Sequence, residues 1–141
     1  ILIYQREFFV SMSEPVMAIS LSYFSKLNLE MSITLESEIK HKSAFFAENG
    51  IILEGQAPIY VAPPYYLEVP VVYEEGQGIR FAIGLYVQTN GGNVYQQADK
   101  LFINTPNDVY IYVSGVTDFK QKELFFSKKK LYDGKHPAHS I

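Results

Sequence analysis

The chain has 141 residues, of which 48% are hydrophobic and 19% charged, with a formal net charge of -3 and no cysteine. This is the length of one domain, and the hydrophobic content is enough for a buried core, which excludes a disordered chain. The negative net charge argues against binding of nucleic acid, which requires a basic surface. The lack of cysteine excludes a disulfide framework. No apolar run is long enough to span a membrane.

The first ten residues, "ILIYQREFFV", are typical of a strand. They have no basic start, no long apolar stretch and no small-residue cleavage site, so they do not resemble a signal peptide. We therefore expect the chain to begin inside a larger protein. The alternative is a short protein whose first strand begins at once.

Alternating apolar and polar residues predict antiparallel strands along most of the chain. The clearest case is "LNLEMSITLES", residues 27–37, in which every second residue is apolar. Asn49-Gly50, Asn90–Asn93 and Asp99-Lys100 are expected to form tight turns. Further strands are expected at residues 17–23, 41–48, 50–56, 79–89, 94–97, 101–105 and 109–119.

About eight strands, with turns at intervals of roughly ten residues and no helical pattern, predict an all-β antiparallel β-sandwich. We assign this domain to residues 3–119. Residues 120–141 lose the alternation and contain three consecutive lysines, so we interpret them as a tail or a linker.

Few residues could carry catalysis or hold a metal ion. His136 and His139 have a metal-binding spacing only on a helix, and the proline between them argues against one. His41 lies between two lysines, where an exposed strand position is the simpler interpretation. Adjacent Glu74 and Glu75 point to opposite faces of a strand and cannot flank one glycosidic bond. We expect no catalytic residue, no metal site and no cofactor.

Residues 54–81, "EGQAPIYVAPPYYLEVPVVYEEGQGIRF", differ from the strands around them because they are rich in proline and tyrosine. Tyrosine offers a sugar both an apolar ring face and a hydroxyl, and proline stiffens a loop against entropy loss on binding. The same composition suits docking onto another domain, or a loop that only closes the sandwich. The residues alone leave these interpretations open. The candidate residues are Pro58, Tyr60, Pro63, Tyr65, Tyr66 and Tyr73.

Short motifs occur in a characteristic order between Arg6 and Phe119: "REFFVS", "VMAISLS", "HK", "LEGQAPIYVAPPYY", "PVVYEEGQGIRF", "GG" and "SGVTDF". Their order and spacing resemble the N-terminal β-domain of glycoside hydrolase family 95, the α-L-fucosidases and related α-galactosidases. The chain departs from that pattern at Tyr60, where the family has histidine, and over residues 117–122, where it has TDFKQK and the family has TSFNGF. Arg80 matches the arginine of the family's Met-Arg-Phe motif.

The resemblance implies a supersandwich-like domain, not itself catalytic, whose partner is the (α/α)6 catalytic barrel of the same parent chain. In the family the barrel carries out inverting hydrolysis of α-linked fucose or galactose. We expect Pro58–Tyr73 to contact the barrel and an oligosaccharide at the cleft rim. Arg80 would fix this loop through backbone carbonyls or by pairing with a carboxylate such as Glu74.

The resemblance also implies a secreted or periplasmic parent. Two other classes of function stay open at this stage. One is a stand-alone carbohydrate-binding β-sandwich module, in which the tyrosines form an exposed platform. The other is a structural or adhesion domain unrelated to sugars.

Overall fold

The protein was analysed as a computed structural model, which describes residues 3–24, 28–63, 71–104 and 106–119. Within these residues the chain forms antiparallel strands in two sheets and contains no helix. The predicted all-β sandwich is thereby confirmed. The predicted tail, residues 120–141, lies outside the described residues, so the domain limit at residue 119 stays a prediction.

Nine strands are described, close to the roughly eight that the spacing of the turns suggested. Their bounds are β1 (Ile3–Val10), β2 (Val16–Phe24), β3 (Glu30–Ile33), β4 (His41–Phe46), β5 (Gly50–Gln56), β6 (Arg80–Asn90), β7 (Asn93–Gln97), β8 (Lys100–Asn104) and β9 (Asp108–Thr117).

The strand expected over residues 27–37 is shorter in the structure. It extends only over β3, because its partner is the five-residue strand β8, on which Glu30 lies opposite Asn104 and Ile33 opposite Leu101. Leu35 packs against the core although it lies beyond the end of β3. The apolar alternation therefore predicted burial correctly but overestimated the length of the paired strand.

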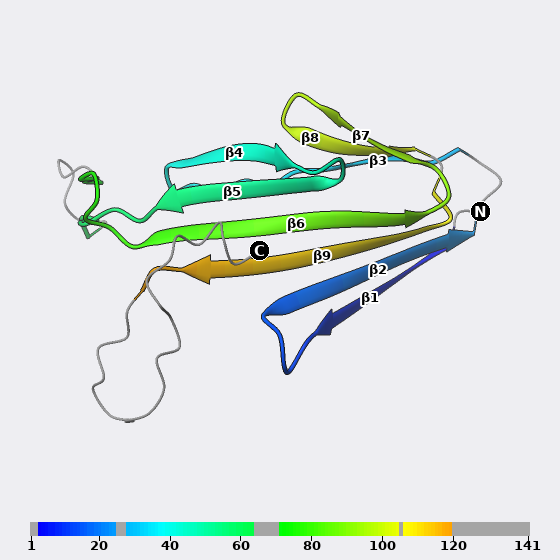
Figure 1. Ribbon diagram of the computed structural model, residues 1–141, viewed down its shortest axis with the longest axis horizontal. Coiled ribbons are helices and arrows are strands. Elements are labelled where there is room, and N and C mark those ends of the chain that lie inside the picture. Colours follow the sequence, from blue (N-terminus) through cyan, green and yellow to red (C-terminus); the bar gives the residue numbers. More distant parts are fainter. Residues whose placement is uncertain (1–2, 25–27, 64–70, 105, 120–141) are drawn as a thin grey trace.

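The strands form a six-stranded sheet in the order β1-β2-β9-β6-β5-β4 and a three-stranded sheet in the order β3-β8-β7 (Figure 1). The pairs β1-β2, β4-β5 and β7-β8 are hairpins of consecutive strands. The last strand, β9, lies between β2 and β6, so the centre of the large sheet is made by segments far apart in the sequence. This arrangement makes the sheet depend on long-range pairing.

The turn between β4 and β5 differs from the one expected at Asn49-Gly50. Phe46 pairs directly with Gly50, so the turn consists of the three residues between them, and Ala47 takes the positive φ of 50°. Gly50 belongs to β5, where a Cβ atom would lie 2.6 Å from the Phe46 ring. The glycine is thus needed for ring packing on the sheet rather than for a left-handed turn.

Two other turns can be compared with their predictions. The turn within Asn90–Asn93 is confirmed, with φ of 73° at Gly91 and 70° at Gly92. The turn expected at Asp99-Lys100 lies one residue earlier, because Gln97 pairs with Lys100 and leaves only Ala98 and Asp99 between the strands. Ala98 there has a positive φ of 55°.

The core lies between the two sheets. The large sheet contributes inward residues at alternate positions, such as Leu85 and Val87 on β6, as a half-buried strand requires. The small sheet contributes Leu101 and Ile103 from β8. The buried cluster consists of Ile51, Leu85, Val87, Leu101, Ile103, Val109 and Ile111.

The substitution Ile103→Ala should destabilise the fold by about 2–5 kcal/mol, because it leaves a cavity where a fully buried side chain joined the two sheets. Chemical denaturation measures the loss. If the alanine variant does not fold, Ile103→Val serves for the same measurement and should lower stability by about 0.5–1.5 kcal/mol. Ile59→Ala, at a position 45% exposed, is the matched control and should change stability by less than about 0.5 kcal/mol. Equal losses at both positions would contradict the assigned core.

Candidate functional site

The proline- and tyrosine-rich segment leaves β5 after Gln56 and returns to β6 at Arg80. Its two arms meet at an antiparallel bridge in which Tyr60 pairs with Val72. The Ile59 N–H donates to the Val72 carbonyl at 2.9 Å, and the Val72 N–H donates to the Tyr60 carbonyl at 2.9 Å. We call residues 57–63 with 71–79 the loop stem. The Tyr60–Val72 bridge is isolated and lies outside the β5-β6 ladder, which ends at the pair of Gln56 and Arg80.

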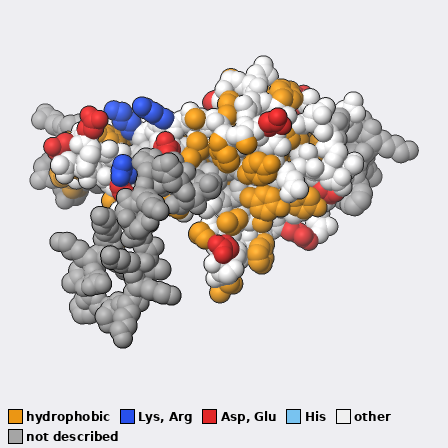
Figure 2. Space-filling view, in the orientation of Figure 1, with side chains coloured by type: hydrophobic (Ala, Val, Ile, Leu, Met, Phe, Trp, Pro, Cys, Tyr) orange, Lys and Arg blue, Asp and Glu red, His pale blue; other side chains and the backbone are white. Residues whose placement is uncertain are grey.

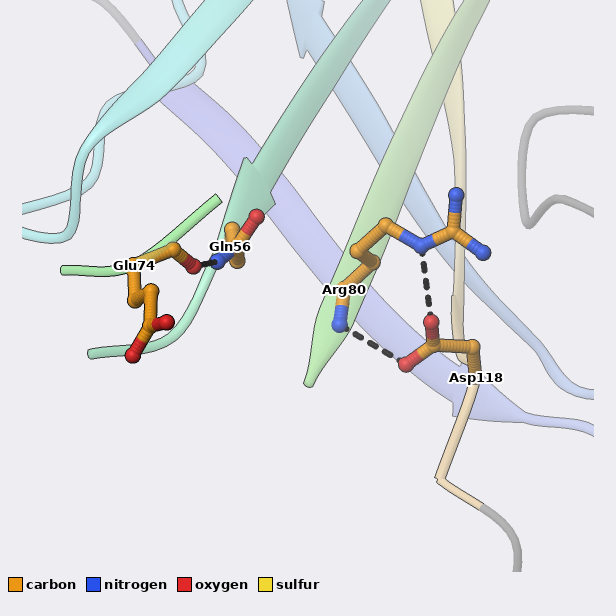
Figure 3. Close-up of polar contacts among 4 residues, drawn as sticks. All are labelled: Gln56, Glu74, Arg80 and Asp118. Atoms are coloured by element: carbon orange, nitrogen blue, oxygen red, sulfur yellow. Dashed lines mark hydrogen bonds and ion pairs between the residues drawn. The ribbon is translucent and has the colours of Figure 1, made fainter. Parts of the chain in front are cut away.

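The base of the loop stem is held by close backbone packing and by Gln56. The Ala57 N–H donates to the Ile79 carbonyl at 2.8 Å. Gln56 Nε2 donates to the Glu74 carbonyl at 2.6 Å (Figure 3). At Gly78 a Cβ atom would lie 1.8 Å from the Ala57 carbonyl oxygen, so only glycine allows the two arms to approach this closely.

Tyr73 anchors the loop stem to the neighbouring connection. Its hydroxyl accepts a hydrogen bond from the Lys40 N–H at 3.2 Å, and its side chain is half-buried. The Gln56 N–H reaches the Lys40 carbonyl at 3.4 Å. Of the candidate tyrosines, Tyr73 therefore holds the loop in place instead of being presented to solvent.

Several apolar side chains of the loop stem remain accessible. Tyr60 is 47% exposed, Pro58 and Pro63 are half-buried, and Tyr65 and Tyr66 lie outside the described residues. We define the loop patch as the exposed apolar residues of the stem. They are Ile59, Tyr60, Val61, Val71, Val72 and Ile79.

Arg80 lies at the base of the loop stem and pairs with Asp118, just past the end of β9. Its Nε donates to Asp118 Oδ2 at 2.8 Å, and its N–H donates to Oδ1 at 2.7 Å. The Asp118 N–H in turn donates to the Arg80 carbonyl at 3.0 Å. The expected carboxylate partner, Glu74, is directed away from Arg80 (Figure 3). Register explains the difference, because Phe81 pairs with Thr117 and brings the next residues together.

This contact changes the acidity of Asp118. Partial burial acts to raise the pKa of the Asp118 carboxyl, but the hydrogen bonds and positive charge of Arg80 outweigh it, so the pKa is lowered. The carboxylate is therefore charged and tightly held at neutral pH. Since the Arg80 side chain is 45% exposed, solvent weakens the ion pair.

The arrangement brings together some predicted residues and reveals others. Arg80, Tyr60 and Tyr73 lie at one end of the large sheet, as expected for one site. Gln56 and Asp118 were not predicted. The opposite charges of Arg80 and Asp118 were a usable signal, but it required knowing that β6 and β9 are neighbours.

No group of three or more His, Cys, Asp or Glu side chains among the described residues could hold a metal ion. The same part of the chain contains no helix long and apolar enough to cross a membrane. What the described part of this end offers is a hydrogen-bonded loop stem with exposed apolar side chains.

The fold and the loop stem together define a two-layer antiparallel β-sandwich domain with a hydrogen-bonded loop stem at one end. The family described as "Glycosyl hydrolase family 65, N-terminal domain" matches residues 2–122. The chain belongs to this family, and it is therefore an N-terminal β-domain of the glycoside hydrolase kind. The finer resemblance to family 95 goes beyond what this match shows. No curated protein gives a sequence match to the chain.

Replacing Asp118 by asparagine should lower stability by about 1 kcal/mol at pH 7, because a charge-assisted contact with a partly exposed partner is lost. The folded pKa of Asp118 lies below the unfolded value, about 3.9. Its contribution is therefore present above about pH 4 and is lost as the pH falls through the folded pKa. Urea denaturation from pH 7 to 2 should show the wild-type advantage disappearing at the acid end.

Glu74→Gln is the control for this charge effect, because Glu74 points away from Arg80. It should leave the stability at pH 7 unchanged. A difference between wild type and Asp118→Asn that persists undiminished at pH 2 would show that the ion pair is not its source.

Gly78→Ala should open the base of the loop stem, because the new methyl group meets the Ala57 carbonyl. Hydrogen exchange at the Ala57 amide measures this directly, and protection should be lost. Gly76→Ala is the matched control: Gly76 has a φ of 76° but nothing within 4 Å of the added atom. It should cost about 1 kcal/mol of backbone strain and leave the Ala57 amide protected. Equal protection in both variants would refute the close approach.

Proposed function

We propose that this chain is the non-catalytic N-terminal β-domain of an α-L-fucosidase-like glycoside hydrolase, and that its loop patch packs on an (α/α)6 catalytic barrel of the same parent. In this role the loop also forms part of the rim of the sugar cleft. The observation that carries the proposal is the loop patch, in a chain that belongs to a glycoside hydrolase N-terminal family.

The exposed character of the loop patch supports an interface. Ile59, Val61 and Val71 are each about half exposed, and the backbone at Ile59, Tyr60 and Val72 is hydrogen-bonded. Apolar side chains that are accessible on a hydrogen-bonded scaffold commonly mark a surface that binds another protein or domain. Because the stem is already ordered, packing on a partner costs little conformational entropy.

The ion pair supports the same role. Asp118 follows β9 directly, and the chain continues from there toward residues 120–141. Arg80 thus ties the base of the loop to the point from which the chain leaves the sheet. Fixing these two segments relative to each other would fix how a following domain meets the loop.

The 141-residue chain alone should not hydrolyse 4-nitrophenyl α-L-fucoside, whereas the protein encoded by the whole reading frame should. Release of nitrophenol measures both. In the whole protein, a Val61→Asp substitution should weaken packing of the domains and lower the thermal midpoint, because it places a charge in the loop patch. Met12→Asp is the control, since Met12 is fully exposed outside the patch.

Turnover by the isolated chain would refute the non-catalytic role. A reading frame without a helical barrel would refute the proposed partner. Equal effects of the Val61 and Met12 substitutions would remove the loop patch from the interface.

A further inference from the structure

The two faces of the six-stranded sheet differ in composition. The face covered by the small sheet carries aliphatic residues at its centre, such as Val87 on β6 and Ile111 on β9. The alternate positions form what we call the open face, where hydrophobic side chains are visible over the middle strands (Figure 2). The central open-face residues are Ala18, Ser20, Gly84, Tyr86, Gln88, Tyr110, Tyr112 and Ser114.

An aromatic row crosses the open face over all six strands. Tyr112 on β9 pairs directly with Tyr86 on β6, and both are more than a third exposed. Since paired residues of neighbouring strands share a face at a strand spacing of about 4.8 Å, the register defines one continuous row. Its members, from β1 to β4, are Phe9, Ala18, Tyr112, Tyr86, Gly50 and Phe46.

Two members of this row, Ala18 and Gly50, have little or no side chain, so the neighbouring rings can lie close to the sheet. Gly50 has no side chain, and the Phe46 ring occupies the space a Cβ atom would need. The Phe46 and Tyr86 ring centroids are 6.5 Å apart with an interplanar angle of 33°. The row therefore combines four aromatic rings with glycine and alanine, and its rings form a broad surface along the sheet.

A polar row runs beside the aromatic one. Ser20 and Gln88 lie on either side of Tyr110, which is 38% exposed. They bring a hydroxyl and an amide next to the rings, with both donor and acceptor capacity. The open face therefore combines ring surface with neutral hydrogen-bonding groups.

The charged side chains of the open face lie away from its centre. Glu54 on β5 pairs with Ala82 and with Lys42 on β4, two rows from the aromatic row. Asp108, in the row beyond the polar one, accepts hydrogen bonds from Ser22 at 2.7 Å and from Asn90 at 3.2 Å. Glu7 lies on the edge strand β1 and accepts from Gln5 at 2.8 Å. The centre is thus uncharged, which is complementary to a neutral ligand and offers nothing to an anionic or cationic one.

We propose that the open face binds a neutral oligosaccharide, whose pyranose rings stack on Tyr86 and Tyr112 while Ser20, Tyr110 and Gln88 bond to its hydroxyls. A second protein layer is the other way to cover a sheet, and the covered face shows what such a layer selects here: isoleucine, leucine and valine. Tyrosine, serine and glutamine suit a ligand that is apolar on its ring faces and polar at its rim. This site uses no residue of the loop patch.

Binding can be tested by titration calorimetry of the full 141-residue chain with cellohexaose and maltohexaose, and with hexagalacturonate as an anionic oligosaccharide of equal length. At least one neutral hexasaccharide should bind saturably, and hexagalacturonate should bind more weakly. Tyr112→Ala should raise the Kd about tenfold, the size expected for one lost aromatic contact.

Tyr95→Ala is the matched control. Tyr95 is 37% exposed, like Tyr112, but lies on the small sheet and stacks on Phe102. It should leave the Kd unchanged, and far-ultraviolet circular dichroism verifies that both variants fold. The comparison distinguishes a general effect of removing an exposed tyrosine from a specific effect of removing a ring from the aromatic row.

Three outcomes would overturn the proposal: no saturable binding of either neutral sugar at millimolar concentration, equal losses for the two variants, or tighter binding of hexagalacturonate. A concentration-dependent dimer abolished by Tyr112→Ala, without sugar binding, would also overturn it and assign the face to a second copy. None of these results bears on the contact between the loop patch and a catalytic barrel, which has its own test.

Discussion

Burial of β8 against the large sheet is the contact on which the rest of the structure depends. Leu101 and Ile103 are fully buried in the cluster that joins the two sheets. A small sheet without such a partner has marginal stability in water, and the large sheet would expose its aliphatic face. The same contact places β6 and β9 at the centre of the fold, and both the loop stem and the open face are supported by these strands.

Two aspartates secure the central strands at opposite ends. Near the start of β9, Asp108 accepts from Ser22 of β2 and Asn90 of β6. Beyond its end, Asp118 holds Arg80 at the start of β6. Each carboxylate satisfies donors on a neighbouring strand, so β9 is held in register along its full length. The loop stem is ordered because the β5-β6 pair from which it leaves the sheet is itself fixed in this way.

The backbone at the loop base shows how local sequence and tertiary contact combine. Gly78 permits an approach to Ala57 that any other residue would block. Gln56, at the end of β5, donates to the Glu74 carbonyl, and the Tyr73 hydroxyl of the loop stem accepts from the Lys40 N–H. Proline restricts the loop, but these contacts decide its position. A loop held in this manner presents apolar side chains without collapsing onto the sheet, which is the property an interface between domains requires.

Alternation by itself determined the all-β class, most strand positions and the inward residues, because side chains of a strand alternate strictly between faces. The density of proline and tyrosine singled out the segment around Tyr60, and the order of the short motifs singled out Arg80. The tertiary structure alone decided the sheet order, the short extent of β3 and the turn at Ala47. It likewise decided the partner of Arg80 and the joining of Tyr86 and Tyr112 into one row. The physical reason is that β6 and β9 pair although the β7-β8 hairpin lies between them in the sequence. The alternation within each strand does not specify which distant strands become neighbours.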